Sequence, residues 1–223
     1  MVDMNNILGS LLGSGAVGGF AGGLAGGLAA NALNSKQGRN LGVTALKVGG
    51  AAAIGALAYA AYQRFSDGRA ERQAAPQPTV HTQLAPPPQS SGFLPAPEDQ
   101  DALGLTLVRA MIGAARADGA TDSVESLAIF GRIEQLGLSP DEQQALVAEM
   151  NRPVDMDELV REATRPEIAA EIYLASLLAI DVDTPAEHAY LSMLAARLQL
   201  PRELVSELHR QAQATLRPGE GQL

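Results

Sequence analysis

The sequence predicts an all-α protein in which a glycine-rich, membrane-seeking segment precedes a helical domain. Beyond residue 98, apolar residues recur at helical spacing, and helix starts are well marked by prolines and capping side chains. No segment sustains the alternating pattern of a β-strand. The first 65 residues combine uncharged runs with glycines four positions apart. We therefore divide the chain into a membrane-associated segment (1–65), a linker (66–97), a helical domain (98–217) and a tail (218–223).

The glycine-rich segment contains 32 consecutive uncharged residues, from Met4 to Ser35. On a helix, glycines four apart form a ridge without side chains along which a second helix can approach closely, and such packing drives helix association in lipid. In water, each of these glycines would cost a helix about 1 kcal/mol relative to Ala. The predicted membrane helix-packing surface consists of Gly15, Gly19, Gly23, Gly27, Gly18, Gly22 and Gly26.

A second uncharged run covers residues 48–63, and its 16 residues are fewer than the about 20 that span a bilayer. We expect it to form one arm (46–63) of a hairpin whose other arm is residues 7–33. Tyr59 and Tyr62 suit a membrane interface at the end of this arm. Two alternatives stay open for the whole segment: a disordered Gly/Ala tail, and a soluble glycine zipper at the core of an oligomer.

The charges flanking the two arms bear on membrane orientation. Lys36, Arg39 and Lys47 lie between the arms, whereas the N-terminal flank has no Lys or Arg, which favours a cytoplasmic loop. Three arginines at positions 64, 69 and 72 follow the second arm, so charge leaves the orientation open. We expect the helical domain on the cytoplasmic side. The chain start lacks the basic region of a secretory signal, so we expect the segment to remain in the mature protein.

The composition of the rest of the chain, after the glycine-rich segment, restricts the classes of function that the protein can have. Seven prolines in residues 76–97 predict an extended, mobile linker. From Glu98 onward, 22 acidic residues face ten arginines and no lysine, a balance that repels phosphate backbones and argues against nucleic acid as a partner. The chain has no cysteine, which excludes disulfides and thiolate metal sites.

The helical domain is predicted to contain seven helices. Ser139 with Glu142 forms a capping box around a first-turn proline, and Asp155 with Glu158 opens a short helix. Pro166, Pro185 and Pro201 mark further helix starts. The expected helices cover 99–117, 123–136, 140–151, a short segment from 155, 166–180, and two segments that begin near 185 and 201.

A weak internal repeat relates two helical hairpins of this domain, and each contains an acidic turn. Such clusters of carboxylates suit a hard divalent cation such as Ca²⁺. The competing interpretation is helix capping, by Asp122 with Glu125 and by Thr184 with Glu187. Capping leaves one acid of each turn unexplained, at the wrong end of a helix dipole. The candidate metal ligands are Asp118, Asp122, Glu125, Asp181, Asp183 and Glu187.

No catalytic constellation is visible in the sequence, so we expect no enzymatic activity. His188 and His209 have no neighbouring nucleophile or acid in a recognisable motif. The serines lack a nucleophile-elbow context, and the glycine run does not end in the Gly-Lys-Ser/Thr of a phosphate-binding loop.

Several stretches resemble known families. ARADGATDSVE, GRIEQLGLSPDE and YLASLLAIDVDTPAEHAYLSMLAARLQLP are similar to the TerB-like helical domain associated with tellurite resistance. NSKQGRNLGVTALKVGG and GALAYAAYQ are similar to the YebE-like family. The resemblance implies a bacterial inner-membrane protein without established enzyme activity, whose domain is metal-responsive or scaffolding and linked to envelope or chemical stress. The family's acidic motifs fall on the six candidate ligands, but Val182 replaces an expected glycine.

The leading functional hypothesis is a membrane-anchored helical interaction module. It would oligomerise through the glycine zipper, contact lipid and an unknown protein partner, and bind a divalent cation at the acidic turns. The alternative hypothesis is a soluble stress-response or metal-handling protein, with or without enzymatic activity, whose glycine-rich N-terminus self-associates.

Overall fold

The computed structural model describes residues 2–13, 50–71, 87–88, 91–93, 96–117, 137–153, 155–180 and 182–216. Within these ranges the fold is all-α and contains no strand, as the sequence predicts. A 3₁₀ turn (η4, Pro97–Asp99) leads into the C-terminal helices. The eight described α-helices are α1 (Met4–Gly13), α4 (Gly50–Glu71), α5 (Gln100–Ala115), α7 (Pro140–Met150), α8 (Met156–Glu162), α9 (Pro166–Leu178), α10 (Pro185–Arg197) and α11 (Arg202–Leu216).

The helix boundaries of the C-terminal part follow the local signals in the sequence. Both sides of the capping box are formed at Ser139 before α7 and at Thr184 before α10, and each helix begins with a proline. The Asp155 side chain accepts a hydrogen bond from the backbone N–H of Glu158 at the start of α8. Six of the seven expected helices are thereby confirmed as α5 and α7–α11, and the segment expected over 123–136 lies outside the described residues.

The glycine-rich segment differs from the expected membrane hairpin in its described parts. Among the described residues, no helix combines the length and the apolar character needed to cross a membrane. The helix that contains the second arm, α4, does not end near residue 63 but continues to Glu71, well into the expected linker. The reason is local: the first helix-breaking proline after this arm is Pro76. The predicted glycine surface between Gly15 and Gly27 lies outside the described residues.

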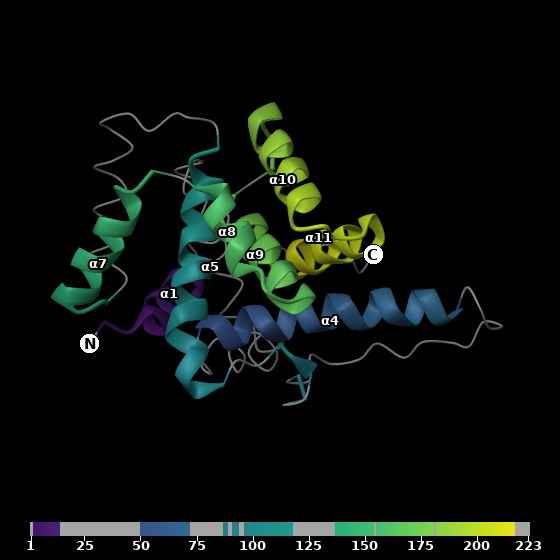
Figure 1. The fold of residues 1–223 in the computed structure, drawn as a ribbon, viewed down its shortest axis with the longest axis horizontal. Coiled ribbons are helices and arrows are strands. Elements are labelled where there is room, and N and C mark those ends of the chain that lie inside the picture. The colour runs from purple at the N-terminus through teal and green to yellow at the C-terminus, as the bar shows by residue number, and fades with distance from the viewer. Residues whose placement is uncertain are drawn as a thin grey trace.

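The N-terminal helices share one hydrophobic core with the C-terminal helices. In Figure 1, α4 runs along one edge of the molecule beneath α9 and α11, and α1 lies against α5. Buried side chains of α1 and α4, among them Ile7, Leu8 and Ile54, belong to the same apolar cluster as Leu107 and Leu174. The sequence analysis instead expected a membrane segment joined to the domain only by a linker. That expectation considered lipid as the partner of these apolar faces, whereas in the structure their partners are α5, α9 and α11.

Helix α9 is the centre of this core. Every residue from Ala169 to Ile180 is buried, so the helix has no solvent-facing side over that length. A helix that is apolar all round is typical of the interior of a protein. Helices α4, α5, α10 and α11 surround it.

Candidate functional site

The most informative site is the surface between α4 and the helices it packs on, which we call the α4 interface. It consists of α4 together with the facing sides of α1, α5, α9 and α11. The side chains that α4 buries there are small, with two exceptions, and short side chains let helix axes approach closely. They are Ala51, Ala53, Ile54, Ala56, Leu57, Ala58 and Ala61.

Two glycines of α4 lie where another part of the chain comes too close for any side chain. A Cβ atom added at Gly50 would lie 2.4 Å from the backbone nitrogen of Gly9 and 2.6 Å from the Cβ of Leu8, so α1 and α4 touch at this point. A Cβ added at Gly55 would lie 2.2 Å from the carbonyl oxygen of Phe93. Gly50 and Gly55 therefore permit close backbone approach within one chain. They are not among the glycines predicted to pack in lipid, which lie outside the described residues.

The segment that crosses Gly55 carries an aromatic cluster. The Phe93 ring is 1% exposed, and its centroid lies 5.6 Å from those of both Tyr59 and Tyr62. Gly92 precedes it with φ of 77°, a left-handed conformation that favours glycine and turns the chain toward α4. Tyr59 and Tyr62, expected at a membrane interface, are therefore partners of Phe93 in the structure.

Two adjacent asparagines in α1 connect the starts of three other helices. The Asn5 side chain accepts a hydrogen bond from the backbone N–H of Ala51 (2.9 Å) and donates one to Gln100 (3.3 Å). The Asn6 side chain donates to Glu142 Oε1 (2.9 Å). The first turn of a helix has free N–H groups, and Asn5 satisfies one of those of α4. Asn6, followed by the backbone and hydroxyl of Ser139, holds the pKa of Glu142 below its usual value.

Glu171 is the unusual group in the α4 interface. It lies in the middle of α9, is 1% exposed, and neither carboxyl oxygen has a hydrogen-bond partner among the described residues. Its Oε1 atom lies 3.0 Å from the position that a Cβ of Gly55 would occupy, so the carboxyl group faces α4. Burial raises the pKa of Glu171 well above its usual value, while the charge of Arg165 lowers it and that of Glu167 raises it.

A second buried polar contact joins α9 to α11. The hydroxyl of Tyr173 lies 2.8 Å from Nε2 of His209. Burial raises the pKa of Tyr173 to about 12. Burial, and then the charge of His188, lowers the pKa of His209. This pair is a packed hydrogen bond between two core helices, and it gives His209 the partner that the sequence did not reveal.

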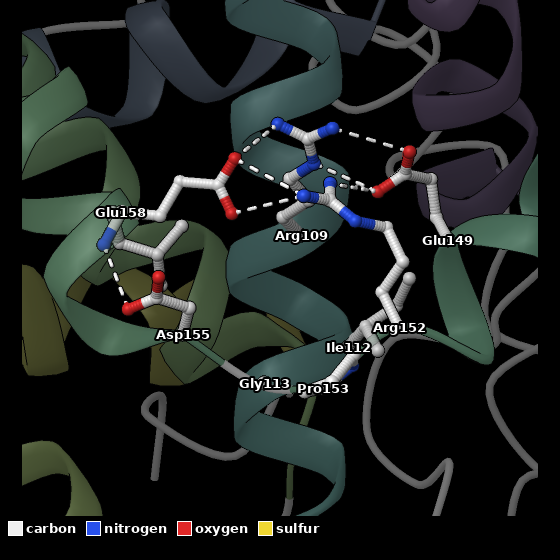
Figure 2. Close-up of a pocket in the computed structure, with 9 residues that line it drawn as sticks. Arg109, Ile112, Gly113, Glu149, Arg152, Pro153, Asp155 and Glu158 are labelled. Carbon is white, nitrogen blue, oxygen red and sulfur yellow. Dashed lines mark hydrogen bonds and ion pairs between the residues drawn. The ribbon is translucent and has the colours of Figure 1, made fainter.

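A cluster of ion pairs holds α7 and α8 on α5. Figure 2 shows Arg109 of α5 between two carboxylates, with its Nε 2.7 Å from Glu149 and its Nη1 2.9 Å from Glu158. Arg152 also contacts both carboxylates, at 2.9 Å and 3.4 Å. The small pocket that these residues line also includes Ile112, Gly113, Pro153, Asp155 and Leu159. Two arginines thus neutralise two glutamates, an arrangement that joins helices and leaves no uncompensated charge among these four.

The candidate metal ligands fall mostly outside the described residues. Asp118, Asp122, Glu125 and Asp181 are not described. Asp183 is exposed, and Glu187 is 4% exposed, with Oε2 accepting hydrogen bonds from the backbone N–H of Asp183 and from the N–H and hydroxyl of Thr184. The capping interpretation is confirmed for Glu187. Binding of a cation by the two acidic turns stays a prediction.

The profile of a family described as protein of unknown function (DUF533) matches residues 18–212 of the chain. The chain belongs to the DUF533 family. A Yersinia enterocolitica protein described as an uncharacterized protein in ampR 5'region is 30% identical to this DUF533 protein over 98 residues, which cover 44% of the chain and 70% of that relative. No solved structure matches the chain.

Glu171, Asn5 and Phe93 of this DUF533 protein are not among the residues predicted from the sequence. A signal for Glu171 was available, since a lone glutamate in the otherwise apolar run IAAEIYLASLL has no polar face to occupy. No comparable signal existed for Asn5, because its partner Gln100 lies 95 residues away in the sequence. Nor did one exist for Phe93, whose aromatic partner Tyr59 belongs to α4.

Proposed function

We propose that this DUF533 protein is a helical interaction module that holds small-residue helices and associates with a membrane through its glycine-rich segment. The observation that carries the first part is the α4 interface, in which α9 and α11 hold a helix rich in Ala and Gly. A surface shaped for one such helix suits others of similar profile, including those of another copy of the chain. The proposal assigns no catalytic step to the protein.

Membrane association is supported by the uncharged run from Met4 to Ser35 and its regularly spaced glycines. The resemblance to TerB-like and YebE-like proteins supports a bacterial inner-membrane location and a link to envelope or chemical stress. In this proposal the region between α1 and α4 contacts lipid and further copies, while the domain remains on the cytoplasmic side.

Cell fractionation tests the membrane part of the proposal. We expect the full chain in the membrane pellet after a high-salt wash, and in the supernatant only after detergent. A variant with Gly19→Asp and Gly23→Asp places two charges in the uncharged run and should shift the chain to the soluble fraction. A matched Gly68→Asp variant, altered in α4, should stay in the pellet. Recovery of the unaltered chain in the soluble fraction without detergent would contradict the proposal.

The second candidate function is a soluble protein whose glycine-rich segment self-associates. The burial of the apolar faces of α1 and α4 inside the protein favours it. Sedimentation of the soluble fraction separates the two: an oligomer of defined mass without detergent supports the alternative.

We also propose a divalent cation at the acidic turns. Millimolar Ca²⁺ should then raise the melting temperature of the full chain, and Asp118→Asn should abolish the rise. Asp157→Asn, a change of an exposed acid of α8 outside both turns, serves as the control. An unchanged melting temperature with Ca²⁺, Mg²⁺ and Mn²⁺ would leave capping as the role of these acids.

A further inference from the structure

Helix α4 places its closest glycine contact directly over a buried acid. Gly55 lies against both the carbonyl oxygen of Phe93 and Oε1 of Glu171. In the docked state Glu171 is 1% exposed and lacks a hydrogen-bond partner among the described residues. A carboxylate in such surroundings loses its hydration without compensation, so only the protonated form is readily buried.

We infer that α4 is a releasable latch, whose docking on α9 is coupled to the uptake of one proton by Glu171. When α4 leaves, water reaches the carboxyl group and Glu171 can ionise. When α4 docks, the carboxylate must take up a proton before Gly55 and Phe93 close over it. The inference goes beyond the proposed function and holds whether or not the protein associates with a membrane.

The sign of the coupling follows from the two states. Exposed, the Glu171 carboxyl group has the ordinary glutamate pKa of 4.5, and docked it has a higher one. Between these two values docking binds one proton, so the docking equilibrium constant falls by up to about tenfold for each unit of pH increase. Docking is therefore strongest in acid and weakens toward alkaline pH.

Few other ionisable groups face this acid. On α9 itself, the charges that affect the pKa of Glu171 are Arg165 and Glu167, with opposite signs. Gly55 of α4 faces the carboxyl group of Glu171, and the backbone of Phe93 lies beside it in the segment before η4. Neither group titrates. The ionisable residues of α4 begin with Tyr59, about one helical turn beyond Gly55. Those of its other neighbours include Arg109 of α5, Arg116 just after α5, and Glu203, Glu207 and His209 of α11.

Two kinds of group contribute pH dependence of the opposite sign: carboxylates with lowered pKa values (Glu142, Glu149 and Asp155) and His209. The lowered pKa of Glu142 removes stability only below its usual value of 4.5. The lowered pKa of His209 reduces stability only below its usual value of 6.5. A comparison of the unaltered chain with a Glu171 variant cancels both contributions.

Hydrogen exchange of backbone amides in the full chain tests the latch, because it detects rare opening. Protection of residues 51–61, corrected for intrinsic exchange and measured where opening is at equilibrium, should fall as the pH rises above 4.5, by up to about tenfold per pH unit until the raised pKa of docked Glu171 is passed. In Glu171→Gln this dependence should disappear and the protection at pH 8 should rise. Glu171→Leu, which also cannot bind a proton, should behave in the same way.

Glu162→Gln is the matched control, since Glu162 is an exposed glutamate of the neighbouring helix α8 and should keep the unaltered dependence. Protection of α4 that is independent of pH in the unaltered chain would overturn the inference. So would an equal dependence in Glu171→Gln. Protection of α5 and α9 with the same size and slope as that of α4 would also overturn it, because α4 would then open only when the whole protein unfolds.

Discussion

At Gly55 the missing side chain decides how closely three parts of the chain approach. A methyl group there would overlap the carbonyl oxygen of Phe93, 2.2 Å from its Cβ position, and would make a tight contact with Oε1 of Glu171 at 3.0 Å. At Gly68, on the same helix, nothing lies within 4 Å of an added Cβ. A substitution at Gly55 therefore tests the packing role of glycine, whereas one at Gly68 tests only the cost of glycine to helix stability.

We predict that Gly55→Ala lowers the free energy of unfolding by about 1–3 kcal/mol, because the added methyl group forces Phe93 or α4 to move. Gly68→Ala should raise it by up to about 1 kcal/mol through higher helix propensity. Urea unfolding of both variants measures the difference. Equal changes in the two variants would contradict the close approach seen at Gly55.

The contact between Asn6 and Glu142 should give a pH-dependent loss of stability when it is removed. Because the pKa of Glu142 is below its usual value of 4.5 in the folded protein, the stabilisation exists above that value and is lost in more acidic solution. We predict that Asn6→Ala lowers the free energy of unfolding by about 1 kcal/mol at pH 7 and by less at a pH well below 4.5. Gln144→Ala, at an exposed position of α7, should have little effect at either pH.

Side-chain contacts were predictable from the sequence only where they are local. The capping boxes at Ser139 and Thr184 join residues three apart, so the spacing alone predicted them. Asn6 and Glu142 are 136 residues apart, and nothing in either neighbourhood points to the other. Gly55 and Glu171 are also far apart in the sequence, so their contact was equally unpredictable.

Among the helices, α5 is the element that connects α7 and α8 to the core. Arg109 contacts Glu149 of α7 and Glu158 of α8. Arg116 donates hydrogen bonds to the carbonyl oxygens of Met150, the last residue of α7, and of Arg152 just after it. Both arginines therefore act across helices, and the first of them has side-chain exposure of only 22%.

We predict that Arg109→Ala lowers the free energy of unfolding by about 1–3 kcal/mol, since it leaves two partly buried carboxylates with one arginine. Arg161→Ala removes an exposed pair with Asp155 and should cost less than about 1 kcal/mol. Thermal melts at low and high salt compare them. A smaller loss for Arg109→Ala than for Arg161→Ala would contradict the role of the cluster.

Helix boundaries were largely predictable, and helix partners were not. Prolines and capping residues fixed the starts of α7, α9 and α10, because those signals act within one turn. The apolar character of α4 was equally visible, but an apolar face rich in Ala and Gly packs as well on a protein core as on a helix in lipid. Its burial against α9 and α11 thus required the structure.

In the whole molecule, the N-terminal helices α1 and α4 form part of the hydrophobic core and are not an appendage joined to it only by a linker. A chain that begins at residue 72 would expose the sides of α5, α9 and α11 that α1 and α4 cover. We predict that it melts at a lower temperature than the full chain and binds a hydrophobic dye. Removal of residues 218–223 is the control and should change neither property. An unchanged melting temperature for the shortened chain would show that residues 98–217 fold independently, as the sequence suggested.

The arrangement of α4 and α9 also sets an order of events during synthesis. Helix α4 ends at Glu71, but α9 is not complete until Leu178, so the ribosome makes α4 roughly a hundred residues before its central partner. At about 5–20 residues per second, this interval is on the order of 5–20 s. Throughout that time the newborn helix lacks α9 and α11, and only α1 and later α5 are available to cover part of its apolar face. A lipid surface or a nearby nascent copy can therefore bind the helix before α9 is made. Which partner α4 binds depends on whether that encounter is faster than translation.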